Sequence, residues 1–258
     1  METAKLLVNN VSKTFYTTKN TIAAVRTASI AVKDGEFISL IGPSGCGKST
    51  ILDIAAGLTS PDEGTVSLNG TDITNQKGHV SYMPQSDVLF PWRTILDNVI
   101  IPLEVAGVNK KEAREQAQSL LTLFGLESFA DSYPHTLSGG MRQRAAFLRT
   151  HLCQKEVMLL DEPFGKLDAL TRRQLQQWLL SIWQQFQRSV VLVTHDVDEA
   201  LLLSDRIYVM SSRPGQIIYE LTVDLPRPRD PEVMTTQTFN EMKRTLFQHL
   251  QEANSPVS

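Results

Sequence analysis

The 258-residue sequence predicts an α/β fold in which a parallel sheet is accompanied by an antiparallel β layer and an inserted α-helical subdomain. Three observations lead to this prediction. Short apolar runs, as expected of strands buried on both faces, occupy residues 37–41, 157–160, 190–194 and 207–210. Helix-like segments separate the later runs at residues 170–187 and 198–204, and this alternation implies right-handed crossovers and a parallel sheet. Between the first two runs, residues 94–151 have helical periodicity.

The antiparallel layer is predicted from short β segments near the start of the chain. They occupy residues 5–11, 22–32 and 65–68, and turn-forming residues separate them. A further short strand is expected at residues 80–83, ending at Pro84 and Gln85. A first helix is expected at residues 50–57, directly after the first apolar run. In the helical block we expect one helix at residues 110–124 and a second that begins near Ser138. The last helix is expected at residues 238–251, after the stiff Pro-Arg-Pro-Arg stretch at 226–229.

The changes between strand-like and helix-like sequence patterns divide the chain into four parts. We expect the first part of the core at residues 1–87, the helical subdomain at 88–155, the second part of the core at 156–225, and a tail with a short helix at 226–258. The sequence shows no internal repeat and no low-complexity tract.

Composition excludes several classes of protein. The 25 basic and 28 acidic residues are well mixed and give a net charge of −3, so we expect no nucleic-acid partner. The two cysteines, Cys46 and Cys153, predict no disulfide framework and favour a reducing cytoplasm. No signal peptide and no apolar segment long enough to span a bilayer is recognisable. If the protein works at a membrane, another chain must supply the spanning helices.

The most informative motif follows the first apolar run and fits the pattern G-x-x-x-x-G-K-[ST] of a phosphate-binding loop. It comprises Gly42, Pro43, Ser44, Gly45, Cys46, Gly47, Lys48, Ser49 and Thr50. Backbone N–H groups of such a loop, together with the start of the helix that follows, form an anion site. Lys48 is expected to reach the β- and γ-phosphates, and the Ser49 hydroxyl to bind Mg²⁺. The sequence therefore predicts a P-loop NTPase core.

Polar residues that suit nucleotide hydrolysis follow the other apolar runs, at the carboxyl ends of the predicted strands. Asp161 is placed to hold Mg²⁺ opposite Ser49, and Glu162, with its side chain on the other side of an extended backbone, is the candidate general base. His195 is expected to contact the γ-phosphate and position the attacking water. Gln85 is expected to bind Mg²⁺ through its carbonyl or to hold that water.

A second motif, LSGGMRQ at residues 137–143, makes little sense within one chain. Ser138, Gly139 and Gly140 begin a helix, yet two glycines weaken a first turn, and no Glu or Gln stands three residues after Ser138 to complete a capping box. Such a sequence exposes a helix N-terminus to an anion that must approach closely. The alternative is an ordinary Ser cap with a flexible start.

Taken together, these motifs resemble the nucleotide-binding subunit of an ATP-binding cassette (ABC) transporter over essentially the whole chain. The resemblance implies a head-to-tail homodimer with two ATP molecules, each between the phosphate loop of one copy and Ser138, Gly139 and Gly140 of the other. It also implies that Asp168 acts across this interface and that Phe15, rather than Tyr16, stacks on the purine. One departure is Lys166, which occupies a position that usually carries a small residue.

A finer resemblance is to importers of nitrate, taurine, alkanesulfonate, bicarbonate and thiamine precursors. It depends on LFPWRT at 89–94, FGKLDALTR at 164–172 and SSRPG at 211–215, while RTHL at 149–152 slightly favours a pyrimidine or thiamine-precursor system. It implies integral membrane permease subunits, a solute-binding protein and a peripheral location on the cytoplasmic face of the inner membrane. Phe90, Pro91 and Trp92 are the candidate permease contact, or else an apolar loop that packs on its own subdomain.

The sequence disfavours two alternatives to a transport ATPase. Soluble cassette proteins of DNA repair carry long coiled-coil insertions and those of translation carry two cassettes, and this sequence has neither. A module that binds nucleotide without hydrolysing it is opposed by the presence of both Glu162 and His195. The sequence does not name the transported solute.

Overall fold

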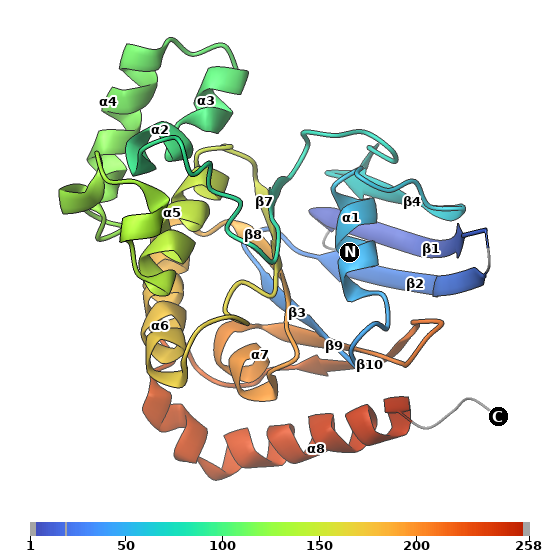
Figure 1. Ribbon diagram of the computed structural model, residues 1–258. Helices are drawn as coiled ribbons and strands as arrows, with labels where there is room; N and C mark the ends of the chain where they lie inside the picture. Colours follow the sequence, from blue (N-terminus) through green and yellow to red (C-terminus); the bar gives the residue numbers. More distant parts are fainter. Residues whose placement is uncertain (1–3, 19, 255–258) are drawn as a thin grey trace.

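The computed structural model describes residues 4–18 and 20–254, which form two sheets with helices packed around them (Figure 1). The larger sheet has six strands in the order β10-β9-β3-β8-β7-β6. These are β3 (Phe37–Ile41), β6 (Ser81–Met83), β7 (Val157–Asp161), β8 (Ser189–Val193), β9 (Arg206–Met210) and β10 (Ile217–Thr222).

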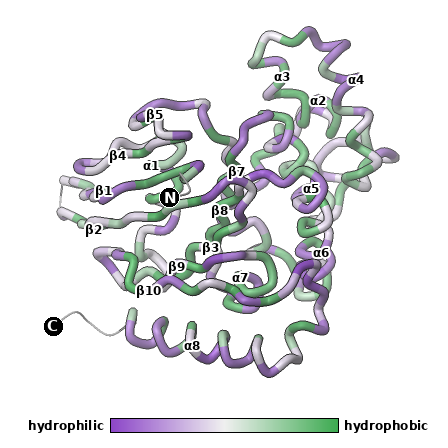
Figure 2. The backbone as a smooth tube through the Cα atoms, turned by 180° about the vertical axis from the view of Figure 1, so that it is seen from behind, coloured by the Kyte–Doolittle hydropathy of each residue, from purple (hydrophilic) through white to green (hydrophobic). Residues whose placement is uncertain are grey.

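The predicted parallel core is confirmed. β3 runs parallel to β8 and β9, and β7 runs parallel to β6 and β8. Every residue of β3, β7 and β8 is buried, as their continuous apolar runs predict, and β3 and β8 are coloured hydrophobic in Figure 2. The sequence reading missed β10, which is antiparallel to β9. As an edge strand with alternating half-buried and exposed residues, β10 lacks an apolar run.

The smaller sheet is antiparallel in the order β2-β1-β4-β5. Its strands are β1 (Leu6–Tyr16), β2 (Thr21–Val32), β4 (Glu63–Leu68) and β5 (Thr71–Asp72). β1 is longer than the expected segment 5–11, because irregularities in its pairing with β2 carry the strand past Val11. This extension brings Phe15 to the end of the strand, beside the candidate site.

Eight α-helices occur in the described residues; six begin and end within about three residues of the expected helices, whereas α2 and α3 were not expected as separate helices. They are α1 (Lys48–Ala55), α2 (Ile95–Val99), α3 (Ile101–Val105), α4 (Lys110–Leu121), α5 (Gly139–His151), α6 (Ala169–Phe186), α7 (Val197–Leu203) and α8 (Gln237–Asn254). Three short 3₁₀ turns lie at Glu127–Phe129, Pro134–Thr136 and Pro231–Thr235. Among the residues that the structure describes, no helix is both long and apolar enough to cross a membrane.

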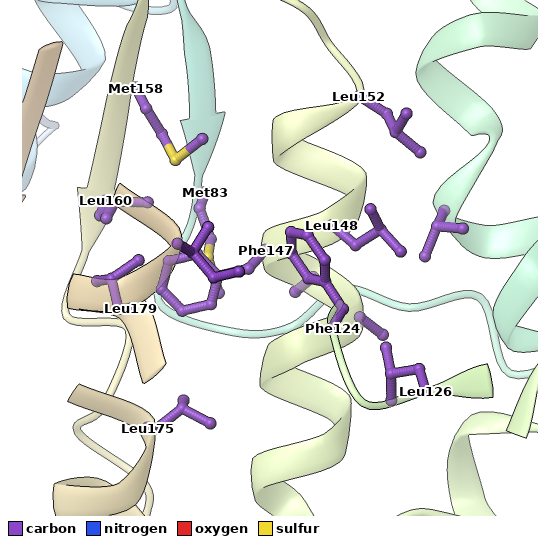
Figure 3. Packing of buried hydrophobic residues seen from close by; sticks show 14 of the residues in the cluster. Met83, Phe124, Leu126, Phe147, Leu148, Leu152, Met158, Leu160, Leu175 and Leu179 are labelled. Carbon is purple, nitrogen blue, oxygen red and sulfur yellow. The ribbon is translucent and has the colours of Figure 1, made fainter. Parts of the chain in front are cut away.

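Helices α2 to α5 form the inserted block beside the β6–β7 edge of the large sheet (Figure 1). The block shares a hydrophobic core with the sheet, since Phe147 of α5, Met83 of β6 and Leu160 of β7 belong to one buried cluster (Figure 3). Phe147 also lies 5.6 Å from Trp178 of α6, measured between ring centroids. The helical block is therefore fixed to the strand ends that carry the candidate site.

The C-terminal segment is part of the packed structure. Phe239 and Leu246 of α8 are buried in a cluster with Ile41, and Arg229 of the Pro-Arg-Pro-Arg stretch is only 6% exposed. The Arg229 guanidinium donates hydrogen bonds to the carbonyl oxygens of Leu201 and Ser204 at the end of α7. The expected tail thus contributes a buried cation to the core.

Candidate nucleotide site

The phosphate loop lies between β3 and α1, as predicted. Gly47 adopts φ of 108°, and a Cβ there would come within 2.8 Å of the Ala24 carbonyl oxygen. Glycine is needed at this position because of both its backbone conformation and the close approach of β2. The loop therefore lies close against β2 of the antiparallel sheet.

Lys48 is the first residue of α1 and is 5% exposed. Its ammonium group donates hydrogen bonds to the carbonyl oxygens of Gly42 at 2.8 Å and Pro43 at 2.9 Å. A buried cation held by loop carbonyls is well placed to exchange these partners for phosphate oxygens. Cys46, by contrast, packs into the core, and burial raises the pKa of its thiol.

A cavity of about 540 Å³ opens beside the loop. One side is apolar and comes from β1 and β2, and the other is polar and comes from the loop and neighbouring strand ends. The lining residues are Phe15, Ile22, Ala24, Ser44, Gly45, Gly47, Lys48, Ser49, Thr50, Gln85, Glu162 and Arg213. Phe15 is 39% exposed and lines the cavity, whereas the more exposed Tyr16 does not. An apolar ring beside an anion site suits a nucleotide.

Two oxygen donors meet at one point of the site. The Ser49 hydroxyl donates a hydrogen bond to Asp161 Oδ1 at 3.1 Å, joining the start of α1 to the end of β7. Burial raises the pKa of Asp161, and the Ser49 hydrogen bond partly offsets this effect. Hydroxyl and carboxylate oxygens are ligands that Mg²⁺ prefers, so the pair fits that ion.

Gln85 and His195 both approach one carboxylate oxygen of Glu162. Gln85 Nε2 donates to Glu162 Oε2 at 3.0 Å, and His195 Nδ1 lies 3.6 Å from the same oxygen. The expectation of an extended backbone at Glu162 is wrong, because φ is 44° and the N–H group donates to the Val193 carbonyl oxygen. A left-handed residue other than glycine is strained by about 1–3 kcal/mol, a feature found most often at functional sites.

The second motif lies outside this cavity. Ser138, Gly139, Gly140 and Asp168 are not among the described residues that line it. Ser138 is exposed and caps α5 by accepting a hydrogen bond from the Met141 N–H at 3.3 Å. Gly140 has a packing role that the sequence reading missed, since a Cβ there would lie 2.8 Å from Thr171 Cγ2 of α6. Asp168 caps α6, and hydrogen bonds from Thr171 and Leu170 lower its pKa.

Arg213 was not predicted as a site residue, although it belongs to the SSRPG segment. Its Nε and Nη2 atoms donate to the Gly45 carbonyl oxygen at 3.1 and 2.7 Å, and its side chain lines the cavity. The only signal in the sequence was the resemblance of this segment to one importer branch. The contact depends on the loop between β9 and β10, and β10 was not predicted.

The chain matches known proteins over most of its length. The family model described as "ABC transporter" matches residues 25–165. An uncharacterized ABC transporter ATP-binding protein of Methanocaldococcus jannaschii is 44% identical over 96% of this chain and 92% of its own length. A nitrate import ATP-binding protein of Synechocystis is 38% identical, covering 94% and 90%. A solved dimeric, post-hydrolysis ATP-binding cassette bound to ADP and Pi is 31% identical, with a TM-score of 0.74 over 86% of this chain and all of that one.

Proposed function

The chain belongs to the ABC transporter family, and from this premise we propose how its residues bind and hydrolyse ATP. The protein is the ATP-hydrolysing subunit of an ABC importer, as the sequence predicted. The predicted fold and family are confirmed. A soluble cassette outside transport is not favoured, because the curated relatives include several import ATP-binding proteins.

ATP lies along the 540 Å³ cavity in this proposal, with the adenine on Phe15 and the phosphates in the loop of residues 42–50. Lys48 turns from the loop carbonyls to the β- and γ-phosphates. Ser49, Asp161 and Gln85 would hold Mg²⁺, and the ion would neutralise phosphate charge. Support for this assignment is the 3.1 Å contact between Ser49 and Asp161.

Glu162 is the general base of the proposed hydrolysis. Its carboxylate takes a proton from the attacking water, and Gln85 and His195, which already face Oε2, orient that water and the γ-phosphate. The observation that carries the proposal is this convergence of Gln85 and His195 on Glu162 beside the phosphate loop. Three separate strand ends, on β6, β7 and β8, supply the three side chains.

The site is completed by a second copy of the chain. Ser138, Gly139 and Gly140 of one copy approach the γ-phosphate held by the other, and Asp168 contacts the opposite site. Two observations support this arrangement: these residues are absent from the cavity of their own copy, and the similar cassette bound to ADP and Pi is dimeric. ATP binding then closes the homodimer, and hydrolysis reopens it.

The membrane partner docks, we propose, on the loop before α2. Phe90 and Trp92 stack there with ring centroids 5.1 Å apart, and Trp92 is 71% exposed. Buried Asn98 fixes the loop, because its side chain accepts from the Phe90 N–H at 2.7 Å and donates to the Phe90 carbonyl oxygen at 3.1 Å. A rigid, exposed aromatic pair suits a permease segment at the cytoplasmic face of the membrane. A solute-binding protein completes the importer.

The solute is, in this proposal, small and polar or anionic. The relatives include import ATP-binding proteins named for nitrate, formylaminopyrimidine and aliphatic sulfonates, at 38–42% identity. Since this chain only supplies energy, the choice of solute lies with the permease and the binding protein. Affinity measurements on a binding protein encoded beside this gene, with these three solute classes, would test the proposal.

The hydrolytic assignment is tested with Glu162→Gln. This isosteric change keeps the hydrogen-bonding partners but removes the base, so we expect ATP binding to persist and turnover to fall by at least about 100-fold. Binding is measured by equilibrium titration and turnover by phosphate release. Unchanged hydrolysis would remove Glu162 from this role.

A further inference from the structure

Arg172 contacts two segments of the site from the first turn of α6. Its Nη2 atom donates a hydrogen bond to the Leu167 carbonyl oxygen at 3.1 Å, one residue before Asp168. Its Nη1 atom lies 3.5 Å from Asp196 Oδ2, one residue after His195. A single guanidinium therefore joins the loop after β7 to the loop after β8.

Asp196 divides its carboxylate between two tasks. Oδ1 accepts hydrogen bonds from the N–H groups of Asp198 and Glu199 and so caps α7. Oδ2 faces Arg172. Because Asp196 directly follows His195, its position sets where the histidine backbone lies.

Arg172 and Asp196 lie around the same small cavity as Glu162 and His195. A small cavity of about 10 Å³ behind the site is lined by Glu162, Phe164, Gly165, Arg172, Thr194, His195, Asp196 and Glu199. Arg172 Nε is buried and has no hydrogen-bond partner within the described part of the chain. Burial raises the pKa of Glu199 to about 8, whereas the Asp196 carboxylate is the group that pairs with Arg172. The Arg172 and Asp196 side chains are 28% and 31% exposed, so the pair is only partly shielded from water.

We propose that Arg172 is a positioning residue that couples residues 165–168 to His195. Since Asp168 is proposed to contact the opposite ATP site, Arg172 passes the closure of that site to the histidine of its own copy. The proposal rests on the ATPase function above and adds a route between the two sites. Neither Arg172 nor Asp196 was predicted as a site residue from the sequence.

The test compares four variants of the full chain: Arg172→Met, Arg172→Lys, Asp196→Asn and the double variant Arg172→Met/Asp196→Asn. The Asn variant keeps the α7 cap through its oxygen and turns its amide toward Arg172, so it tests the link even if Arg172→Met folds poorly. Arg173→Met is the matched control, because Arg173 is the exposed neighbour on the same helix. The measurements are kcat, KM for ATP, the Hill coefficient for ATP and the melting temperature.

We expect Arg172→Met and Asp196→Asn each to lower kcat about 10- to 100-fold with KM changed less than about threefold. The Hill coefficient of both single variants should fall toward 1. Arg172→Lys should have a higher kcat than Arg172→Met, and the kcat of the double variant should be no lower than that of the less active single variant. Wild-type kcat in both single variants, or losses that multiply in the double variant, would overturn the coupling. Because Glu162→Gln is assayed in parallel, inactivity of that variant beside active Arg172 variants refutes this inference alone.

Discussion

Replacing Arg229 with methionine should destabilise the protein strongly, although Arg229 is far along the chain from every motif. Its guanidinium is buried and donates to carbonyl oxygens at the end of α7 and after β10, including Ser204 at 2.5 Å and Leu225 at 3.2 Å. Burial lowers the pKa of Arg229 to about 10, so the group is charged at neutral pH and complements the negative end of α7. Methionine fills the space of the stem but donates no hydrogen bond.

The expected loss follows from the groups left without a partner. Removing one member of a buried charged network costs about 3–5 kcal/mol, which in a chain of this size lowers the melting temperature by roughly 6–20 °C. Urea and thermal unfolding measure the change, with Arg244→Met on the exposed side of α8 as the control. A difference of less than about 1 kcal/mol between the two variants would refute the view that Arg229 holds the C-terminal segment to α7.

Three further predictions concern stability and the aromatic loop. Burial raises the pKa of Glu199 to about 8 from its ordinary 4.5, so the stabilisation of the folded state by the bound proton is complete below pH 4.5 and is lost as pH rises through 8. The free energy of unfolding in urea should therefore decline by about 1.4 kcal/mol per pH unit between these values, and Glu199→Gln should remove this decline. Parallel pH profiles of the wild type and Glu199→Gln would contradict this prediction. Gly140→Ala should lower the free energy of unfolding by about 1–3 kcal/mol, because the added Cβ would clash with Thr171. Much of that loss should disappear in a Thr171→Ser background, because serine lacks Cγ2. Equal losses in both backgrounds would exclude the clash. Asn98→Leu should lower the free energy of unfolding by about 2–4 kcal/mol and make the Phe90 loop susceptible to limited proteolysis, because the hydrogen bonds of Asn98 to Phe90 are lost. An unchanged cleavage pattern would show that Asn98 does not fix the loop.

The parallel core was predictable because its strands are buried on both faces and therefore appear as apolar runs. The phosphate loop was predictable because a fixed spacing of glycines and a lysine is needed to bind phosphate. Edge elements carry neither signal. β10 alternates between half-buried and exposed residues and was therefore not predicted. Without β10, the contact between Arg213 and Gly45 could not be predicted either.

Backbone conformation and long-range packing explain the remaining differences. The left-handed conformation of Glu162 cannot be foreseen from residue type, since glutamate rarely adopts it. The close approach of Gly140 to Thr171 depends on how α5 crosses α6, which the local pattern does not encode. Arg229 was predicted to lie in a stiff tail, because no sequence pattern shows which carbonyl oxygens need a hydrogen-bond donor.

The most direct test of the composite site is the mass of Glu162→Gln in solution, measured by light scattering with and without Mg-ATP. We expect ATP to double the mass of the Glu162→Gln protein. Adding Ser138→Arg should keep the protein monomeric while the ATP affinity of the single copy is preserved. A monomer that hydrolyses ATP at the full wild-type rate, or a Ser138→Arg chain that still dimerises and turns over ATP normally, would contradict it.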